Sequence, residues 1–180
     1  LTFNMMPYEL VEAIGECCTE LELLKLIGFS IRASHKLVPI QKSFQRLKTL
    51  EVRLLRGSFA EVAFDENEGG NDVDTITAQF VHFLIDSSHN LQNLTINAVA
   101  RFMDEQFYSD LMRQNPLKNI QKLCLSISPS RSQTLAKARQ LITSLPSLQY
   151  FSLSRWRIPE KELSTLRKEI KENNWDVVLL

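Results

Sequence analysis

The sequence has little of what several classes of function require. It contains three histidines, three cysteines and five glycines in 180 residues, and its formal charge is zero because 21 basic side chains balance 21 acidic ones. A neutral chain has no overall field that would attract nucleic acid or an anionic membrane surface. We therefore expect neither a nucleic-acid partner nor a membrane partner.

The cysteines and the apolar segments indicate the cellular compartment. Cys17, Cys18 and Cys124 are odd in number and two of them are adjacent, which favours reduced thiols over a disulfide framework. No apolar run approaches the roughly 18 residues that cross a bilayer, and no secretory signal opens the chain. We expect a cytoplasmic or nuclear protein. Leu1-Thr-Phe resembles the end of a strand, which predicts a piece of a longer protein.

Motifs for metal, cofactor and catalytic sites are missing. His35, His82 and His89 show no metal-ligand spacing with the cysteines. The glycines form neither a phosphate-binding loop nor a dinucleotide fingerprint, and the nucleophile motif Gly-x-Ser-x-Gly does not occur. We expect no metal, no cofactor and no catalytic residue, so the chain is predicted not to be an enzyme.

An apolar motif recurs with a period near 28 residues. It has the form apolar-x-x-apolar-x-apolar, and its copies are Leu21, Leu24 and Leu26; Leu47, Leu50 and Val52; Leu91, Leu94 and Ile96; Ile120, Leu123 and Leu125; Leu148, Phe151 and Leu153; and, more weakly, Asn174, Val177 and Leu179. Successive copies begin 26, 44, 29, 28 and 26 residues apart. Segments with helical periodicity separate them, so each repeat is predicted to be a strand followed by a helix.

The expected helices have apolar residues on one face. They are Tyr8 to Cys18; a helix capped by Asp74 that carries Ile76, Phe80, Phe83 and Leu84; a helix marked by Phe107 and Leu111; one carrying Leu135, Ala138, Leu141, Ile142 and Leu145; and one with Pro159 in its first turn that carries Leu163, Leu166 and Ile170.

The copies that begin at Leu47 and Leu91 are 44 residues apart, which is longer than the other intervals. The excess predicts an inserted surface loop near residues 57–74. Its sequence is acidic, contains the pair Gly69 and Gly70, and lacks periodicity. It begins like a calcium-binding loop at Asp65, but Ile76 stands where the coordinating glutamate is needed, so calcium binding is not expected.

The repeat resembles the leucine-rich repeat family, in particular the long irregular repeats of the ribonuclease-inhibitor and F-box-associated types. The resemblance covers nearly the whole chain. It implies an α/β solenoid with a parallel sheet on the concave side and helices on the convex side, and one domain, 1–180, of about six irregular repeats. The family places Asn or Cys three residues after the last strand leucine, and this chain departs from it with Phe29, Leu55, Val99, Ser128 and Trp156. We therefore expect an irregular arc.

We call the apolar positions of the repeated motif the ladder residues. The residues between them are the candidate partner-binding residues, because alternation along a strand sends them to the concave face. They are Lys25, Glu51, Arg53, Asn93, Thr95, Asn97, Lys122, Cys124, Ser126, Tyr150, Ser152 and Ser154, with Leu23, Ile27 and Thr49 on the same face. Hydrogen-bonding groups beside an aromatic anchor suit a protein or peptide partner. The alternative is a set of ordinary solvated strand residues.

Trp156 has two interpretations. Between Arg155 and Arg157 it is a candidate exposed anchor for a partner. The turn position that it occupies points inward in regular repeats, which favours burial.

The favoured function is a protein–protein interaction module. The resemblance further implies the substrate-recognition part of an F-box type ubiquitin ligase, with the ligase adaptor bound only through a region outside this chain; the segment Met6 to Ile14 resembles an F-box opening only faintly. The alternatives are a small α/β enzyme with an unrecognised site and a purely structural segment of a longer solenoid. Helices on one face of the sheet favour repeats, whereas helices on both faces favour the enzyme fold.

Overall fold

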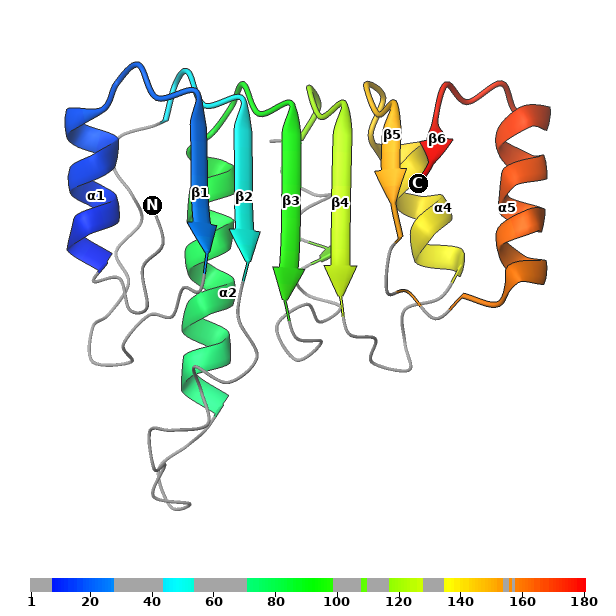
Figure 1. The fold of residues 1–180 in the computed structure, drawn as a ribbon, viewed down its shortest axis with the longest axis horizontal. Coiled ribbons are helices and arrows are strands. Elements are labelled where there is room, and N and C mark those ends of the chain that lie inside the picture. The colour runs from blue at the N-terminus through cyan, green and yellow to red at the C-terminus, as the bar shows by residue number, and fades with distance from the viewer. Residues whose placement is uncertain are drawn as a thin grey trace.

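The fold is α/β, and the described residues form six strands in one all-parallel sheet and four helices of a full turn or more (Figure 1). It is seen in a computed structural model that describes residues 8–27, 44–53, 71–98, 108–109, 117–127, 135–153, 156 and 158–180. The elements in chain order are α1 (Tyr8–Cys17), β1 (Leu23–Ile27), β2 (Thr49–Arg53), α2 (Asn71–Asp86), β3 (Asn93–Ala98), β4 (Lys122–Ile127), α4 (Leu135–Ser144), β5 (Tyr150–Ser152), α5 (Glu160–Glu172) and β6 (Val178–Leu179).

The strands lie in the sheet in the order in which they occur in the chain, from β1 to β6. Each is parallel to its neighbour. In Figure 1 the helices α2 and α4 both lie behind the sheet, while α1 and α5 lie at its two ends. No helix of the described residues covers the face that is turned to the viewer.

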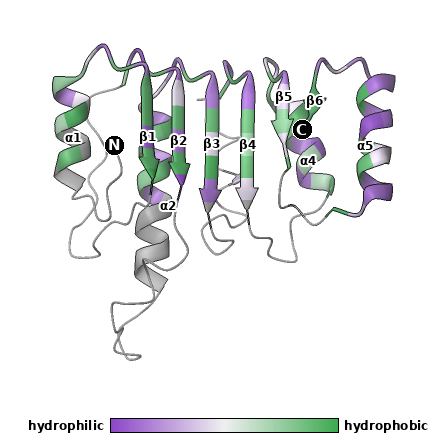
Figure 2. Ribbon diagram, in the orientation of Figure 1, coloured by the Kyte–Doolittle hydropathy of each residue, from purple (hydrophilic) through white to green (hydrophobic). Residues whose placement is uncertain are grey.

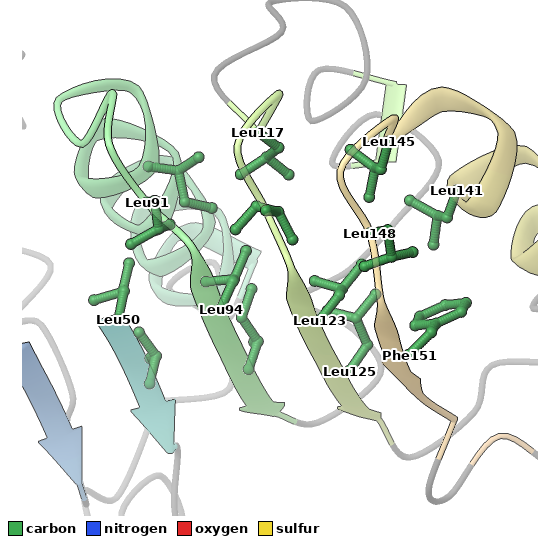
Figure 3. Close-up of a cluster of buried hydrophobic side chains, with 14 of the residues drawn as sticks. Leu50, Leu91, Leu94, Leu117, Leu123, Leu125, Leu141, Leu145, Leu148 and Phe151 are labelled. Atoms are coloured by element: carbon green, nitrogen blue, oxygen red, sulfur yellow. The ribbon is translucent and has the colours of Figure 1, made fainter. Parts of the chain in front are cut away.

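The apolar ladder forms the buried face of the sheet, as the repeat predicts. Pairing aligns Leu24, Leu50, Leu94, Leu123 and Phe151 across five strands, and Leu26, Val52, Ile96 and Leu125 two residues further along. All of these side chains are buried. They pack with Leu91, Leu117, Leu148 and the α4 residues Leu141 and Ile142 in one continuous core, part of which is drawn in Figure 3.

The same turn precedes each of the first five strands. The backbone N–H of the first ladder residue donates to the carbonyl three residues earlier at 3.0–3.1 Å, in the pairs Leu21–Cys18, Leu47–Phe44, Leu91–Ser88, Ile120–Leu117 and Leu148–Leu145. Successive copies are then joined in the same way, because the carbonyls of Glu22, Lys48, Gln92 and Gln121 each accept two N–H groups from the next copy. The repeat in sequence is therefore also a repeat in hydrogen bonding.

The sixth copy was predicted in the wrong register. Leu179, not Val177, pairs with Phe151, so the strand lies two residues later than the motif suggests. The reason is the end of α5: Asn174 has a φ of 53°, and the N–H of Trp175 returns to the carbonyl of Ile170. This left-handed residue terminates the helix and cannot begin the strand motif.

Helix boundaries differ from the expectation in two places. The helix α2 begins at Asn71, so Asp74 lies inside it and residues 71–74 do not belong to the inserted loop. The short polar residues Asn71 and Asp72 precede the apolar stripe and allow an earlier start than the capping argument assumed. Pro159 directly precedes α5 as its N-cap. The remainder of the acidic loop, and all of the helix near Phe107 except 108–109, lie outside the described residues.

Candidate functional site: the polar face of the sheet

Eleven of the twelve predicted partner-binding residues lie on one face of the sheet, which we call the polar face, and they fall into three rows across the strands. The first row is Leu23, Thr49, Asn93, Lys122, Tyr150 and Val178; the second is Lys25, Glu51, Thr95, Cys124 and Ser152; the third is Ile27, Arg53, Asn97 and Ser126. Ser154 lies outside the described residues. Along β2 and β3 these hydrophilic positions alternate with apolar ones, whereas β1 is mostly apolar (Figure 2).

Most of the polar face is accessible. Lys25, Arg53, Lys122 and Tyr150 are exposed, and the central asparagines and threonines are half-buried. Glu51 and Ser126 are the two buried polar residues of the face. The face therefore offers exposed charged and aromatic groups around a centre of neutral hydrogen-bonding groups.

An ion-pair cluster occupies the β1–β2 end of the polar face. The Glu51 carboxylate accepts from Lys25 Nζ at 3.1 Å through one oxygen and from Arg53 Nε through the other. Burial of Glu51 acts to raise its pKa, but the hydrogen bonds from Lys25 and Arg53 outweigh burial and hold the pKa below its ordinary value. Glu51 is therefore ionised near neutral pH and fixes both cations in place.

The β3–β5 part of the face is uncharged apart from Lys122. The Asn93 side-chain amide donates to Thr49 Oγ1 at 3.2 Å, which ties the first row together across β2 and β3. Lys122 pairs in register with Tyr150, an exposed aromatic residue. This part of the face carries the donor, acceptor and aromatic groups that protein interfaces commonly use.

Trp156 is buried and is not part of the polar face. Its indole Nε1 donates to the carbonyl of Leu125 at 3.0 Å, and its ring makes edge-on contacts with Tyr108 and Phe151. The alternative of an exposed anchor is therefore wrong, and the burial that the turn position favours is confirmed.

Two asparagines that the sequence reasoning missed join the repeats at the turn before the strand. The Asn90 side chain donates to the Gln45 carbonyl at 2.7 Å, and Asn119 donates to the His89 carbonyl at 3.2 Å. Both residues immediately precede a first ladder position, which is the signal that could have found them. They provide side-chain bonds to backbone carbonyls at the residue before the motif.

Other chemistry has little support in the part of the chain that the structure describes. There, no group of three or more His, Cys, Asp and Glu side chains could hold a metal ion. No helix in the same residues is both long and apolar enough to cross a membrane. A recess of about 630 Å³ lies between the end of α5 and β6, lined in part by Arg167, Ile170, Lys171 and Trp175, and it contains no predicted site residue.

Comparisons with protein-family models, curated proteins and solved structures find no match to this chain. The function is therefore inferred from the arrangement of the chain's own residues.

Proposed function

We propose that this chain is a leucine-rich repeat segment of solenoid form that binds a partner protein on the polar face. The polar face would then be the concave surface, and α2 and α4 would belong to the convex side. The observation that carries the proposal is a polar face that runs unbroken from β1 to β5 and that no described helix covers.

The strand order supports a repeat architecture. A doubly wound sheet reverses its strand order at a switch point, and its ligands bind there. The six described strands run from β1 to β6 without reversal. Because connections between parallel strands are almost always right-handed, a sheet that grows in one direction keeps its connections on one face and leaves the other open. The placement of α2 and α4 agrees with this expectation.

The composition of the open face supports protein binding over catalysis. An active site needs a nucleophile or an acid–base pair whose neighbours perturb its pKa. The one perturbed carboxylate among the described residues of the polar face, Glu51, is held by Lys25 and Arg53 in an arrangement that a structural ion pair explains. The small-enzyme alternative therefore gains no support from this face.

The ubiquitin-ligase role implied by the resemblance stays a prediction. Its test is whether affinity purification of the intact protein recovers a ligase adaptor and cullin.

The test is affinity purification of the intact protein with a triple variant of the polar face, Arg53→Ala, Asn97→Ala and Tyr150→Ala. A matched control carries Gln140→Ala, Ser144→Ala and Lys161→Ala, three exposed positions on α4 and α5. We expect at least one partner to be lost from the face variant and kept by the control, with unchanged circular dichroism for both. Equal recovery with all three proteins would contradict the proposal and favour the purely structural segment.

A further inference from the structure

The charge of the polar face differs from that of the whole chain. The chain is neutral, with 21 basic and 21 acidic residues. The described residues of the polar face include three cations, Lys25, Arg53 and Lys122, and one carboxylate, Glu51. The face is therefore basic even though the protein as a whole has no net field.

The cations are accessible, whereas the carboxylate is not. The side chains of Lys25 and Arg53 are 45% and 52% exposed, but that of Glu51 is 10% exposed. An ammonium group has three N–H donors and a guanidinium has five, so their bonds to Glu51 leave donors for a second acceptor. Lys25 and Arg53 are thus held by the buried Glu51 carboxylate and still expose N–H donors to solvent.

Another cation, Lys122, lies further across the sheet, beside exposed apolar side chains. Lys122 is on β4, two strands beyond Glu51 and two residues back along the strands, a backbone separation of about 12 Å for strands spaced about 4.8 Å apart that rise about 3.3 Å per residue. In the same row, Tyr150 and Val178 follow on β5 and β6, and these residues are 44% and 52% exposed. Across the sheet the face therefore passes from a cation pair to a single cation and then to an exposed apolar pair.

We propose that the polar face takes an extended acidic segment of its partner, with two carboxylates about three to four residues apart and an apolar side chain beyond the second. Three to four residues of extended chain span about 10–14 Å, which matches the separation of about 12 Å between Glu51, where the cation pair meets, and Lys122. The first carboxylate contacts Lys25 and Arg53, the second contacts Lys122, and the apolar side chain packs on Tyr150 and Val178. This inference rests on the proposed function and specifies the chemistry of the partner.

The test uses the full chain as a labelled probe against a bead-bound library of random peptides long enough to cross the sheet. The variant is Lys122→Glu, and the control is Lys161→Glu, which reverses an exposed cation on α5. We expect selected peptides to be enriched in Asp and Glu near an apolar residue. When these peptides are resynthesised, Lys122→Glu should weaken binding about fivefold, in the range of an exposed ion pair, and added salt should weaken it further. Lys161→Glu should leave binding unchanged. Replacing the second peptide carboxylate with lysine should restore binding to Lys122→Glu.

The failures are distinguishable. Uncharged or basic peptides that bind the wild type and are lost from the triple alanine variant would overturn the acidic segment and leave protein binding by this face intact. Peptides that bind the triple variant as well as the wild type would overturn both proposals. No selected peptide at all would overturn the acidic segment, and the affinity purification would then decide whether the face binds a folded partner. Displacement of acidic peptides by single-stranded oligothymidine at lower concentration than by free peptide would assign the cations to nucleic acid and overturn the inference.

Discussion

The indole of Trp156 supplies apolar packing and a backbone hydrogen bond at the same turn. It stands three residues after the last ladder residue of its repeat, Leu153, and donates to the carbonyl of Leu125, the equivalent ladder residue one repeat earlier. A buried carbonyl without a donor is costly. The large ring therefore provides both packing and a hydrogen bond between neighbouring copies of the motif.

Replacing this indole with phenylalanine tests the role of the hydrogen bond. Trp156→Phe keeps an aromatic ring near Tyr108 and Phe151 but removes the N–H, so we expect a loss of about 1–3 kcal/mol in the free energy of unfolding. Urea denaturation followed by circular dichroism measures it. Trp175→Phe, at a half-buried position, is the control and should cost less. An equal loss for both variants would show that the smaller ring, and not the lost hydrogen bond, lowers the free energy of unfolding.

The Glu51 cluster predicts a pH-dependent contribution to stability. The pKa of Glu51 lies below its ordinary value of 4.5, so its contribution is fully present above that value and is lost as the pH falls through the lowered pKa. The difference in unfolding free energy between wild type and Glu51→Gln should be about 1 kcal/mol near neutral pH and should shrink towards zero in acid. Urea titrations at a series of pH values measure it. Glu20→Gln, in the exposed pair with Arg46, is the control and should show a smaller difference. A difference independent of pH would contradict the assignment.

At the scale of elements, α5 is attached to α4 by a two-bond ion pair. Arg139 Nε and one terminal nitrogen each donate to a separate Glu169 oxygen at 2.6 Å. The hydrogen bond from Arg139 lowers the pKa of Glu169, and the same bond raises the pKa of Arg139. Lysine cannot reproduce this paired geometry.

We therefore expect Arg139→Lys to loosen the α5 segment without unfolding the sheet. Hydrogen exchange followed by mass spectrometry should show faster exchange over residues 160–172 and unchanged exchange in β3 and β4. The control is Arg167→Lys, which alters an exposed pair with Glu160 within the same helix. Faster exchange in β3 as well, or none in α5, would contradict this local role.

Elements could be predicted where the pattern of apolar residues within the element itself determines the structure, and not where distant residues do. The repeated apolar motif predicted the positions and the buried face of β1 to β5, because a shift by one residue would expose the whole apolar set. The order of the strands was an expectation of the resemblance alone, and the structure has that order. The polar face followed directly by alternation. The sixth strand was misplaced because Asn174 and Val177 fit the motif weakly, and the left-handed turn at Asn174 depends on the end of the helix. The bonds made by Asn90 and Asn119 were missed because their acceptors lie 45 and 30 residues away.

At the scale of the whole molecule, the chain in its described parts is a row of similar units. Strand contacts join β1 to β2, β2 to β3 and so on to β6, and each unit bonds to the next through equivalent carbonyls. In the solenoid proposed above, stability would be approximately a sum of unit terms and nearest-neighbour terms. A central unit has two neighbours and the β6 unit has one in the described structure.

The final prediction compares the same substitution at the centre and at the end of this row. Leu94 on β3 is fully buried between two strands, so Leu94→Ala should cost about 2–5 kcal/mol and lower protection from hydrogen exchange throughout the sheet. Leu179 on β6 is half-buried and pairs with β5. Leu179→Ala should cost less and accelerate exchange mainly in α5, β5 and β6, because the other nearest-neighbour contacts remain. Hydrogen exchange and urea denaturation of both variants measure the two effects. If Leu179→Ala weakened β1 and β2 as strongly as β5, the sheet would unfold as one cooperative unit, and the description as a row of nearest-neighbour repeats would be wrong.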